Sequence, residues 1–166
     1  MRYVVLVFLF VGHCLSSPAS RTNPVHERID VGAPTNAEVS KRYYVFNSRG
    51  VTFFEAWRLC QSVGHRLATI TNQNDTRSVE EAVQASSNSK GPWWIAGTDL
   101  GNEGVFVWIS TNQPVGFRTG YSDYAPNQPD NAGGNENCLE IGREGALSWN
   151  DAPCDAKHRY ICEHGG

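Results

Sequence analysis

Cysteine positions limit the folds that this 166-residue chain can adopt. The chain has five cysteines, and Cys14 lies in an apolar N-terminal stretch that we expect to be removed. The other four are Cys60, Cys138, Cys154 and Cys162, and an even number in an exported chain predicts two disulfide bonds. The sequence alone leaves three pairings open. A bond between Cys60 and Cys162 would close a loop of about 100 residues, which the loop-entropy model values at roughly 4–5 kcal/mol.

The N-terminus has the features of a secretory signal peptide. A charged start precedes an apolar run over residues 3–12, and small polar residues follow. The run is too short to span a bilayer, and no later stretch is apolar enough to do so. We therefore expect residues 1–20 to be a signal peptide, cleaved after Ser16 or Ser20, and the protein to be secreted. The alternative is a buried N-terminal helix. Residues 21–42 are polar and lack periodicity, which predicts a flexible N-terminal arm.

Charge and residue types argue against two large classes of function. The formal net charge is −3 and no block of Lys or Arg stands out, so a nucleic acid is not an expected partner. No nucleophile stands in an arrangement with histidine. Acids that could serve a glycosidase lie in a polar, glycine-rich segment suited to a cation, which lowers their pKa values, whereas a general acid needs a raised pKa. We therefore expect the protein not to be an enzyme.

Two helices are predicted in the first half of the domain. Thr52 is placed to cap a helix whose apolar residues repeat at helical spacing until Gly64, which would end it. A second helix is predicted over residues 75–85, with Asn72 or Asn74 as its cap.

The remaining predicted elements are strands. Short aromatic and β-branched runs bounded by polar turns indicate them, at residues 43–46, 93–97, 105–108, 138–141, 147–149 and 158–162. Residues 109–137 form a long loop rich in Gly, Pro and Asn, and such loops are usually functional. Helices followed by strands with one large loop predict an α+β domain. The strand tryptophans Trp94, Trp108 and Trp149 are expected in its core.

Residues 128–151 carry the strongest functional signal. Five oxygen-bearing side chains occur in this segment: Gln128, Asp130, Glu136, Asn150 and Asp151. Calcium takes about 6–8 oxygen ligands from carboxylates, amide carbonyls, backbone carbonyls and water. No cluster of His or Cys suggests zinc or copper instead. The segment therefore predicts a calcium site.

These landmarks together resemble the C-type lectin domain. The residues that carry the resemblance follow the family's order and spacing: Trp94-Ile95-Ala96-Gly97, Gln128-Pro129-Asp130, Glu136-Asn137-Cys138, Trp149-Asn150-Asp151, Cys154 and Cys162. The resemblance covers residues 43–164 and is greatest to single-domain insect lectins with the galactose-type Gln-Pro-Asp. It implies a C-type lectin-like fold with two helices, antiparallel strands and a long calcium-binding loop. It also implies the disulfides Cys60–Cys162 and Cys138–Cys154 and a cis Gln128–Pro129 peptide.

The resemblance further implies how the site works. The principal calcium would be held by Gln128, Asp130, Glu136, Asn150 and Asp151, and two adjacent sugar hydroxyls would complete its shell and contact the same five residues. The amide at 128 and the acid at 130 favour galactose or N-acetylgalactosamine. A second calcium would use Asp99, Glu103, Glu136 and Asn137. The implied function is that of a secreted, calcium-dependent lectin for galactose-type glycans on microbial or host surfaces, acting in innate immunity.

The absence of an aromatic ring just after the triplet Gln128-Pro129-Asp130 leaves a rival interpretation open. Galactose commonly stacks on a ring, but residues 131–134 contain none, and Tyr121 or Tyr124 would have to substitute. We therefore expect weak affinity at a single site, near millimolar, or about −4 kcal/mol. The rival is a protein-binding module of the same fold, with calcium only structural or absent.

Two smaller features also have alternative interpretations. Asn74-Asp75-Thr76 is an N-glycosylation acceptor sequence, which competes with a simple capping role for Asn74. His65 and His158 have no evident partner in the sequence, which favours surface or structural roles. The sequence leaves the oligomeric state open.

Overall fold

The computed structural model describes residues 41–143 and 146–165. The expected signal peptide, residues 1–20, lies outside these residues, as does all but the end of the expected arm. The first strand, β1, spans Arg42–Val51 and begins one residue before the predicted strand. Lys41 is bonded to the domain as well, so the domain includes the last two residues assigned to the arm.

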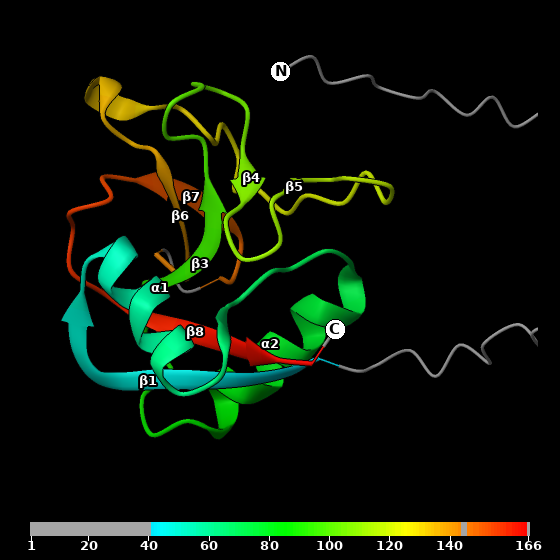
Figure 1. Ribbon diagram of the computed structural model, residues 1–166, viewed down its shortest axis with the longest axis vertical. Coiled ribbons are helices and arrows are strands. Elements are labelled where there is room, and N and C mark those ends of the chain that lie inside the picture. Colours follow the sequence, from blue (N-terminus) through cyan, green and yellow to red (C-terminus); the bar gives the residue numbers. More distant parts are fainter. Residues whose placement is uncertain (1–40, 144–145, 166) are drawn as a thin grey trace, which may run out of the picture. The chain divides into compact units, whose positions relative to one another are not determined.

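The elements form an α+β domain, as predicted (Figure 1). Two helices, α1 (Phe53–Ser62) and α2 (Gln73–Ala85), lie early in the chain. After β1, the strands are β2 (Arg66–Leu67), β3 (Trp93–Thr98), β4 (Val107–Trp108), β5 (Gln113–Pro114), β6 (Cys138–Ile141), β7 (Trp149–Ala152) and β8 (His158–His164). A short 3-10 turn, η1 (Ala132–Gly134), lies in the long loop. No helix among these described elements is long and apolar enough to cross a membrane.

The strand order joins the two ends of the domain. β1 pairs antiparallel with β8, and β8 also pairs with β2 and β3. In Figure 1, β1 (cyan) and β8 (red) run side by side, and β3 connects them to β4, β6 and β7. The pairing of β3 with β8 is parallel, so the expectation of an antiparallel arrangement holds for all the other pairs described but not for this one.

Side-chain caps fix where both helices begin. Thr52 caps α1, as predicted, and Gly64 follows the helix with a positive φ of 75° that suits glycine. Asn72 caps α2, since its Oδ1 accepts from the backbone nitrogens of Asn74 and Asp75 at 2.9 and 3.0 Å. The cap alternatives are therefore resolved in favour of Asn72, and α2 begins two residues earlier than predicted.

Two of the predicted strands begin two residues later in the structure. The run over residues 105–108 contributes only Val107–Trp108 to a strand, because these two residues pair with β5. The run over residues 147–149 is shifted, and β7 is Trp149–Ala152, opposite β6. This second shift places Asn150 and Asp151 in a strand.

The tryptophans and disulfides were predicted correctly. Trp94, Trp108 and Trp149 are at most 1% exposed, and the rings of Trp108 and Trp149 meet edge to face at 5.4 Å. The disulfides are Cys60–Cys162, which joins α1 to β8, and Cys138–Cys154, which joins β6 to the segment after β7.

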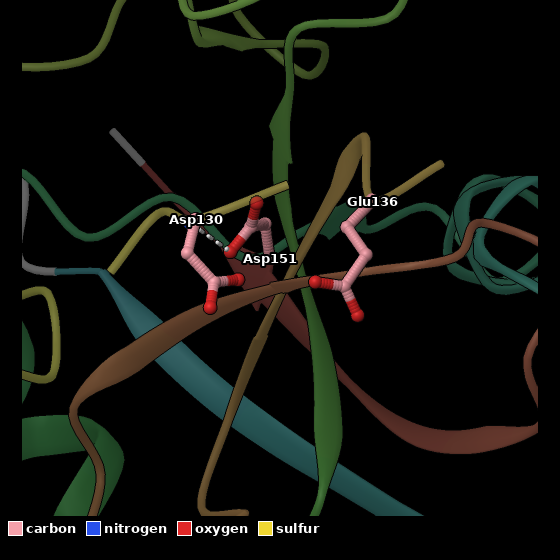
Figure 2. Close-up of side chains that lie close together, drawn as sticks. All are labelled: Asp130, Glu136 and Asp151. Atoms are coloured by element: carbon pink, nitrogen blue, oxygen red, sulfur yellow. Dashed lines mark hydrogen bonds between the residues drawn. The ribbon is translucent and has the colours of Figure 1, made fainter. Parts of the chain in front are cut away.

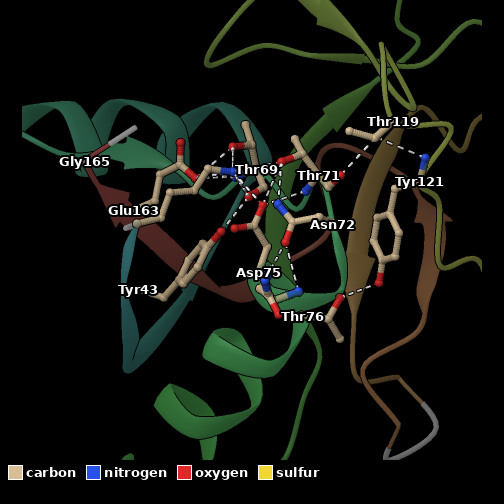
Figure 3. Close-up of polar contacts among 12 residues, drawn as sticks. Tyr43, Thr69, Thr71, Asn72, Asp75, Thr76, Thr119, Tyr121, Glu163 and Gly165 are labelled. Atoms are coloured by element: carbon tan, nitrogen blue, oxygen red, sulfur yellow. Dashed lines mark hydrogen bonds and ion pairs between the residues drawn. The ribbon is translucent and has the colours of Figure 1, made fainter. Parts of the chain in front are cut away.

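A buried polar network closes the domain near its two ends (Figure 3). Glu163 is fully buried and accepts from the backbone nitrogen and hydroxyl of Thr69 at 2.9 and 2.8 Å. Lys41 lies 2.7 Å from Asp75, and Tyr43 donates to the Thr69 carbonyl at 2.8 Å. Burial, followed by the charges of Asp75 and Glu163, raises the pKa of Tyr43, so this hydroxyl stays protonated.

The same network holds the long loop against α2. Thr119 donates to the Thr71 carbonyl at 3.0 Å, and the hydroxyls of Tyr121 and Thr76 lie 2.6 Å apart (Figure 3). The loop is thus attached to the helical part of the domain, which limits its freedom.

The packing between the central strands leaves no room for a side chain at Gly97. A β-carbon there would lie 2.2 Å from Cδ1 and 2.6 Å from Cγ of Leu139, which is fully buried. We expect Gly97→Ala to lower the free energy of unfolding by about 1–3 kcal/mol, as overpacked cores do. Urea denaturation measures this change.

Leu139→Ala provides the matched control for this clash. Alone, it removes buried methyl groups and should cost about 2–5 kcal/mol. Combined with Gly97→Ala, it makes room for the new methyl group, so the two costs should be less than additive. Strict additivity of the two costs would show that the contact with Leu139 is not the cause of the destabilisation by Gly97→Ala.

Candidate metal and ligand site

Three acidic side chains converge at one end of the domain (Figure 2). Asp130 and Glu136 come from the long loop, and Asp151 comes from β7. One carboxylate oxygen of each residue lies within 4.8 Å of the other two. Within residues 41–143 and 146–165, this is the one group of three or more Asp, Glu, His or Cys side chains placed to share an ion. The sequence predicted all three.

Backbone amides hold two of the three carboxylates, those of Asp151 and Glu136, in place. Asp151 is 1% exposed and accepts from the backbone nitrogens of Asp130 and Asn131 at 3.2 and 2.8 Å. Glu136 accepts from the nitrogen of Ala132 at 2.9 Å, while its own nitrogen donates to the Asn131 side chain at 3.0 Å. Asn131 makes this turn possible because its φ of 44° lies in the left-handed region that asparagine tolerates.

The spacing of the cluster suits a calcium ion. Calcium–oxygen distances are about 2.3–2.6 Å, so oxygens on opposite sides of one ion are about 5 Å apart. The separation of up to 4.8 Å among the three carboxylates is compatible with that value. The donor set, carboxylates with nearby carboxamides, is the one that hard cations prefer.

The negative charges also affect one another. Burial, followed by the charges of Asp151 and Asp130, raises the pKa of Glu136, although the amide of Ala132 opposes the shift. Without a cation, the folded chain therefore disfavours the ionised form of Glu136.

The two predicted carboxamide ligands line a cavity of about 280 Å³. Gln128 belongs to a cis Gln128–Pro129 peptide, as the resemblance implied, and its Oε1 accepts from the backbone nitrogen of Asp130 at 3.1 Å. Asn150 precedes Asp151 in β7 and donates through Nδ2 to Glu140 at 2.9 Å and to the Asp151 carbonyl. Both amide hydrogens of Asn150 are thus engaged with the protein.

The residues of the tentative second site are not gathered into one cluster. Asp99 is 2% exposed, with Oδ2 accepting from Gly104 at 2.7 Å and Oδ1 buried without a hydrogen-bond partner. The carbonyl of Asn137 accepts from the Asp99 nitrogen at 3.3 Å. Glu103 is exposed, and it does not join Asp99 and Glu136 in a three-residue group among the described side chains.

Neither candidate stacking ring stands free. Tyr121 is bonded to Thr76, and Tyr124 packs edge to face against Trp149 at 5.3 Å. Burial, followed by the charges of Asp151 and Asp99, raises the pKa of Tyr124. Both rings belong to the support of the loop, and the turn that contains η1 has no ring of its own.

Glu140 and His158 form an interaction that the sequence analysis missed. Glu140 in β6 is fully buried, and its Oε2 lies 2.8 Å from Nε2 of His158 in β8. Burial opposes ionisation of Glu140, but His158 and Arg143 together outweigh it and hold the pKa of Glu140 below its usual value. His158 thus has a partner that was not evident in the sequence, and the contact is consistent with the structural role that the sequence favoured. A buried acid within an otherwise apolar strand was the available signal.

Comparisons with known proteins match the family and the fold. A family described as Lectin C-type domain matches residues 49–164. Salivary C-type lectin 2 of Aedes albopictus is 31% identical over 131 residues, covering 75% of this chain and 84% of that protein. Among solved structures, C-type lectin CEL-I from Cucumaria echinata has a TM-score of 0.65 at 27% identity, covering 80% of this chain and 96% of that one. Herring type II antifreeze protein has a TM-score of 0.61 at 25% identity, covering 80% of this chain and 98% of that one.

Burial of Glu136, together with the nearby carboxylates, predicts opposite effects of one substitution with and without calcium. Because the pKa of Glu136 is raised in the folded chain, its ionisation costs stability as the pH rises above the unfolded value of about 4.3. In chelator at pH 7, Glu136→Gln should therefore raise the urea midpoint above that of the wild type. The difference should vanish near pH 3, where the carboxyl group is protonated in both states.

Calcium should reverse the order of stability, so that the wild type becomes more stable than the Glu136→Gln variant. An ion at 100 times its dissociation constant stabilises the folded state by about 2.7 kcal/mol, and Glu136→Gln should lose most of that gain. A variant that is less stable than the wild type in chelator at pH 7 would contradict the argument from burial and nearby charge.

Proposed function

Because the chain belongs to the C-type lectin domain family, we propose that it is a secreted, calcium-dependent lectin for galactose-type glycans. The observation that carries this proposal is the convergence of Asp130, Glu136 and Asp151 within 4.8 Å at the predicted calcium segment. The membership itself indicates a carbohydrate-binding module without catalytic activity, so the prediction that the chain is not an enzyme is confirmed.

In the proposed site, the three carboxylates and the carboxamide oxygens of Gln128 and Asn150 hold the ion. A bound calcium would supply coordination positions for two adjacent sugar hydroxyls. A carboxylate can only accept hydrogen bonds, whereas a carboxamide can also donate. Both hydrogens of Asn150 are engaged with Glu140 and Asp151, so the side-chain NH₂ of Gln128 is the better placed amide donor for a sugar. With the donor at Gln128 and the acceptor at Asp130, the hydrogen-bond pattern runs in the direction that favours galactose or N-acetylgalactosamine.

A second calcium at Asp99, Glu103, Glu136 and Asn137 is a weaker part of the proposal. Its support is the Asp99 Oδ1 atom, which is buried without a hydrogen-bond partner. Because a buried polar atom without a partner is costly, a cation at this atom would relieve that cost.

The expected affinity is low for one site. Tyr121 is bonded to Thr76 and Tyr124 packs against Trp149, so neither of these two rings is free to turn toward a sugar. We keep the estimate of about −4 kcal/mol, near a millimolar dissociation constant. Recognition of microbial or host surfaces in innate immunity then needs several sites at once. The resemblance to single-domain insect lectins supports this role.

A glycan array in calcium, repeated in chelator, tests the proposed function. We expect galactose-type sugars to be retained in calcium and lost in chelator. The matched variant reverses the triplet through Gln128→Glu with Asp130→Asn, which exchanges donor and acceptor and should move the preference toward mannose by about tenfold or more, or 1.4 kcal/mol. An unmoved preference would rule out direct coordination of the sugar.

The same array distinguishes the second candidate function, a protein-binding module with structural calcium. The missing ring favours this candidate, and the likeness to an antifreeze protein shows that the fold is not confined to proteins named lectins. A protein partner recovered in calcium, with no glycan retained, would replace the lectin proposal with this one.

We also propose that Asn74 carries an N-linked glycan. Asn74 is exposed in the first turn of α2, and because Asn72 provides the cap, Asn74 has no capping role that would explain it. Mass spectrometry of protein secreted from eukaryotic cells should show a glycan that a glycosidase removes. Asn74→Gln should remove the same mass, and Asn72→Gln serves as the control that keeps the acceptor sequence. An unmodified wild-type protein would contradict the proposal.

A further inference from the structure

Glu140 is a buried acid that contacts a proposed calcium ligand without belonging to the ligand set. It stands in β6 directly opposite Asn150 in β7, in the antiparallel register of the two strands. Its Oε1 accepts a hydrogen bond from Asn150 Nδ2 at 2.9 Å. Its side chain is fully buried, so water does not compete for this contact.

Two further side chains fix the Glu140 carboxylate. His158 Nε2 lies 2.8 Å from Oε2, and Arg143 Nε is bonded to Oε1. His158 is itself packed against the Trp94 ring, with 4.3 Å between the ring centroids. Because Oε1 accepts from both Arg143 and Asn150 and Oε2 lies against the packed His158 ring, the carboxylate has little freedom to turn away from Asn150.

The fixed carboxylate determines which end of the Asn150 amide faces the ligand site. An ionised carboxylate only accepts hydrogen bonds, whereas a carboxamide has one accepting end and one donating end. The NH₂ end must therefore face Glu140, and Oδ1 must face away from it. If the amide were flipped, Asn150 Oδ1 would face the Glu140 carboxylate, and two acceptors would lie against each other. The NH₂ hydrogens would then face the cation. We propose that Glu140 is a positioning residue that orients Asn150 so that its Oδ1 can bind calcium, an inference that rests on the proposed function.

Glu140→Gln is the direct test, because glutamine keeps the shape of the side chain but can present either end to Asn150. We expect a 10–100-fold loss of calcium affinity, the range seen when a group that orients a metal ligand is removed. Glu163→Gln is the matched control, since Glu163 is equally buried and lies 3.1 Å from Arg66 but outside the carboxylate cluster. Calorimetric titration of calcium into each protein measures the effect, and the control should bind as the wild type does.

A second substitution separates orientation from a general loss of stability. Asn150→Asp alone should weaken calcium binding, because it places a second carboxylate against Glu140. Combined with Glu140→Gln, it offers an oxygen in either orientation, and the new glutamine can donate to it. We therefore expect the double variant to bind calcium more tightly than either single variant. A double variant weaker than both would overturn the inference.

A calcium-free measurement reports the same contact. In the wild type, the Asn150 side-chain NH₂ should give two inequivalent, slowly exchanging proton signals by NMR. Glu140→Gln should speed this exchange and Glu163→Gln should not. Equal exchange in all three proteins would overturn the inference.

The outcomes distinguish this inference from the proposed function. If the wild type does not bind calcium, the proposed function fails, and with it the role of Glu140. If the wild type binds calcium and Glu140→Gln binds equally well, the positioning role fails and the proposed function stands.

Discussion

The repulsion among three carboxylates held within 4.8 Å is the constraint on which the binding end of the domain depends. Without other contacts to hold them, the three carboxylates would move apart into solvent. Here they are kept together by backbone amides that donate to Asp151 and Glu136, and by a turn that Asn131 allows. The amides supply only partial positive charge, so the arrangement gains stability from a cation. A bound cation would therefore stabilise this loop by supplying a positive charge that the polypeptide does not itself provide.

The scaffold behind this cluster is rigid and mostly apolar. β6 and β7 present Glu140, Asn150 and Asp151 from one paired unit, and the Cys138–Cys154 disulfide joins the start of β6 to the chain beyond β7. The rings of Trp108 and Trp149 fill the space below. Asp130 and Glu136, which lie on a loop, thus meet a third carboxylate on a strand that is paired with β6 and joined to it by a nearby disulfide. Such support from strands helps to hold a binding site in one geometry.

The sequence predicted what depends on local pattern and on the family's order of residues. The helix start at Thr52, the buried tryptophans, the disulfides and the acidic cluster all belong to this class. It did not predict the contact between Glu140 and His158, because that contact arises only when β3 brings β6 and β8 to its two sides. The shift of β7 toward Asn150 and Asp151 was also missed, since pairing with β6 overrides the local preference of residues 147–149.

The bond between Thr76 and Tyr121 gives one hydroxyl two separate tasks. The acceptor sequence at Asn74 requires a hydroxyl at position 76, and the long loop uses the same hydroxyl to reach α2. Serine could serve both tasks, whereas alanine or valine would serve neither. Removing the proposed sugar attachment through residue 76 would therefore also remove one of the bonds that hold the loop, whereas a change at Asn74 would leave these bonds in place.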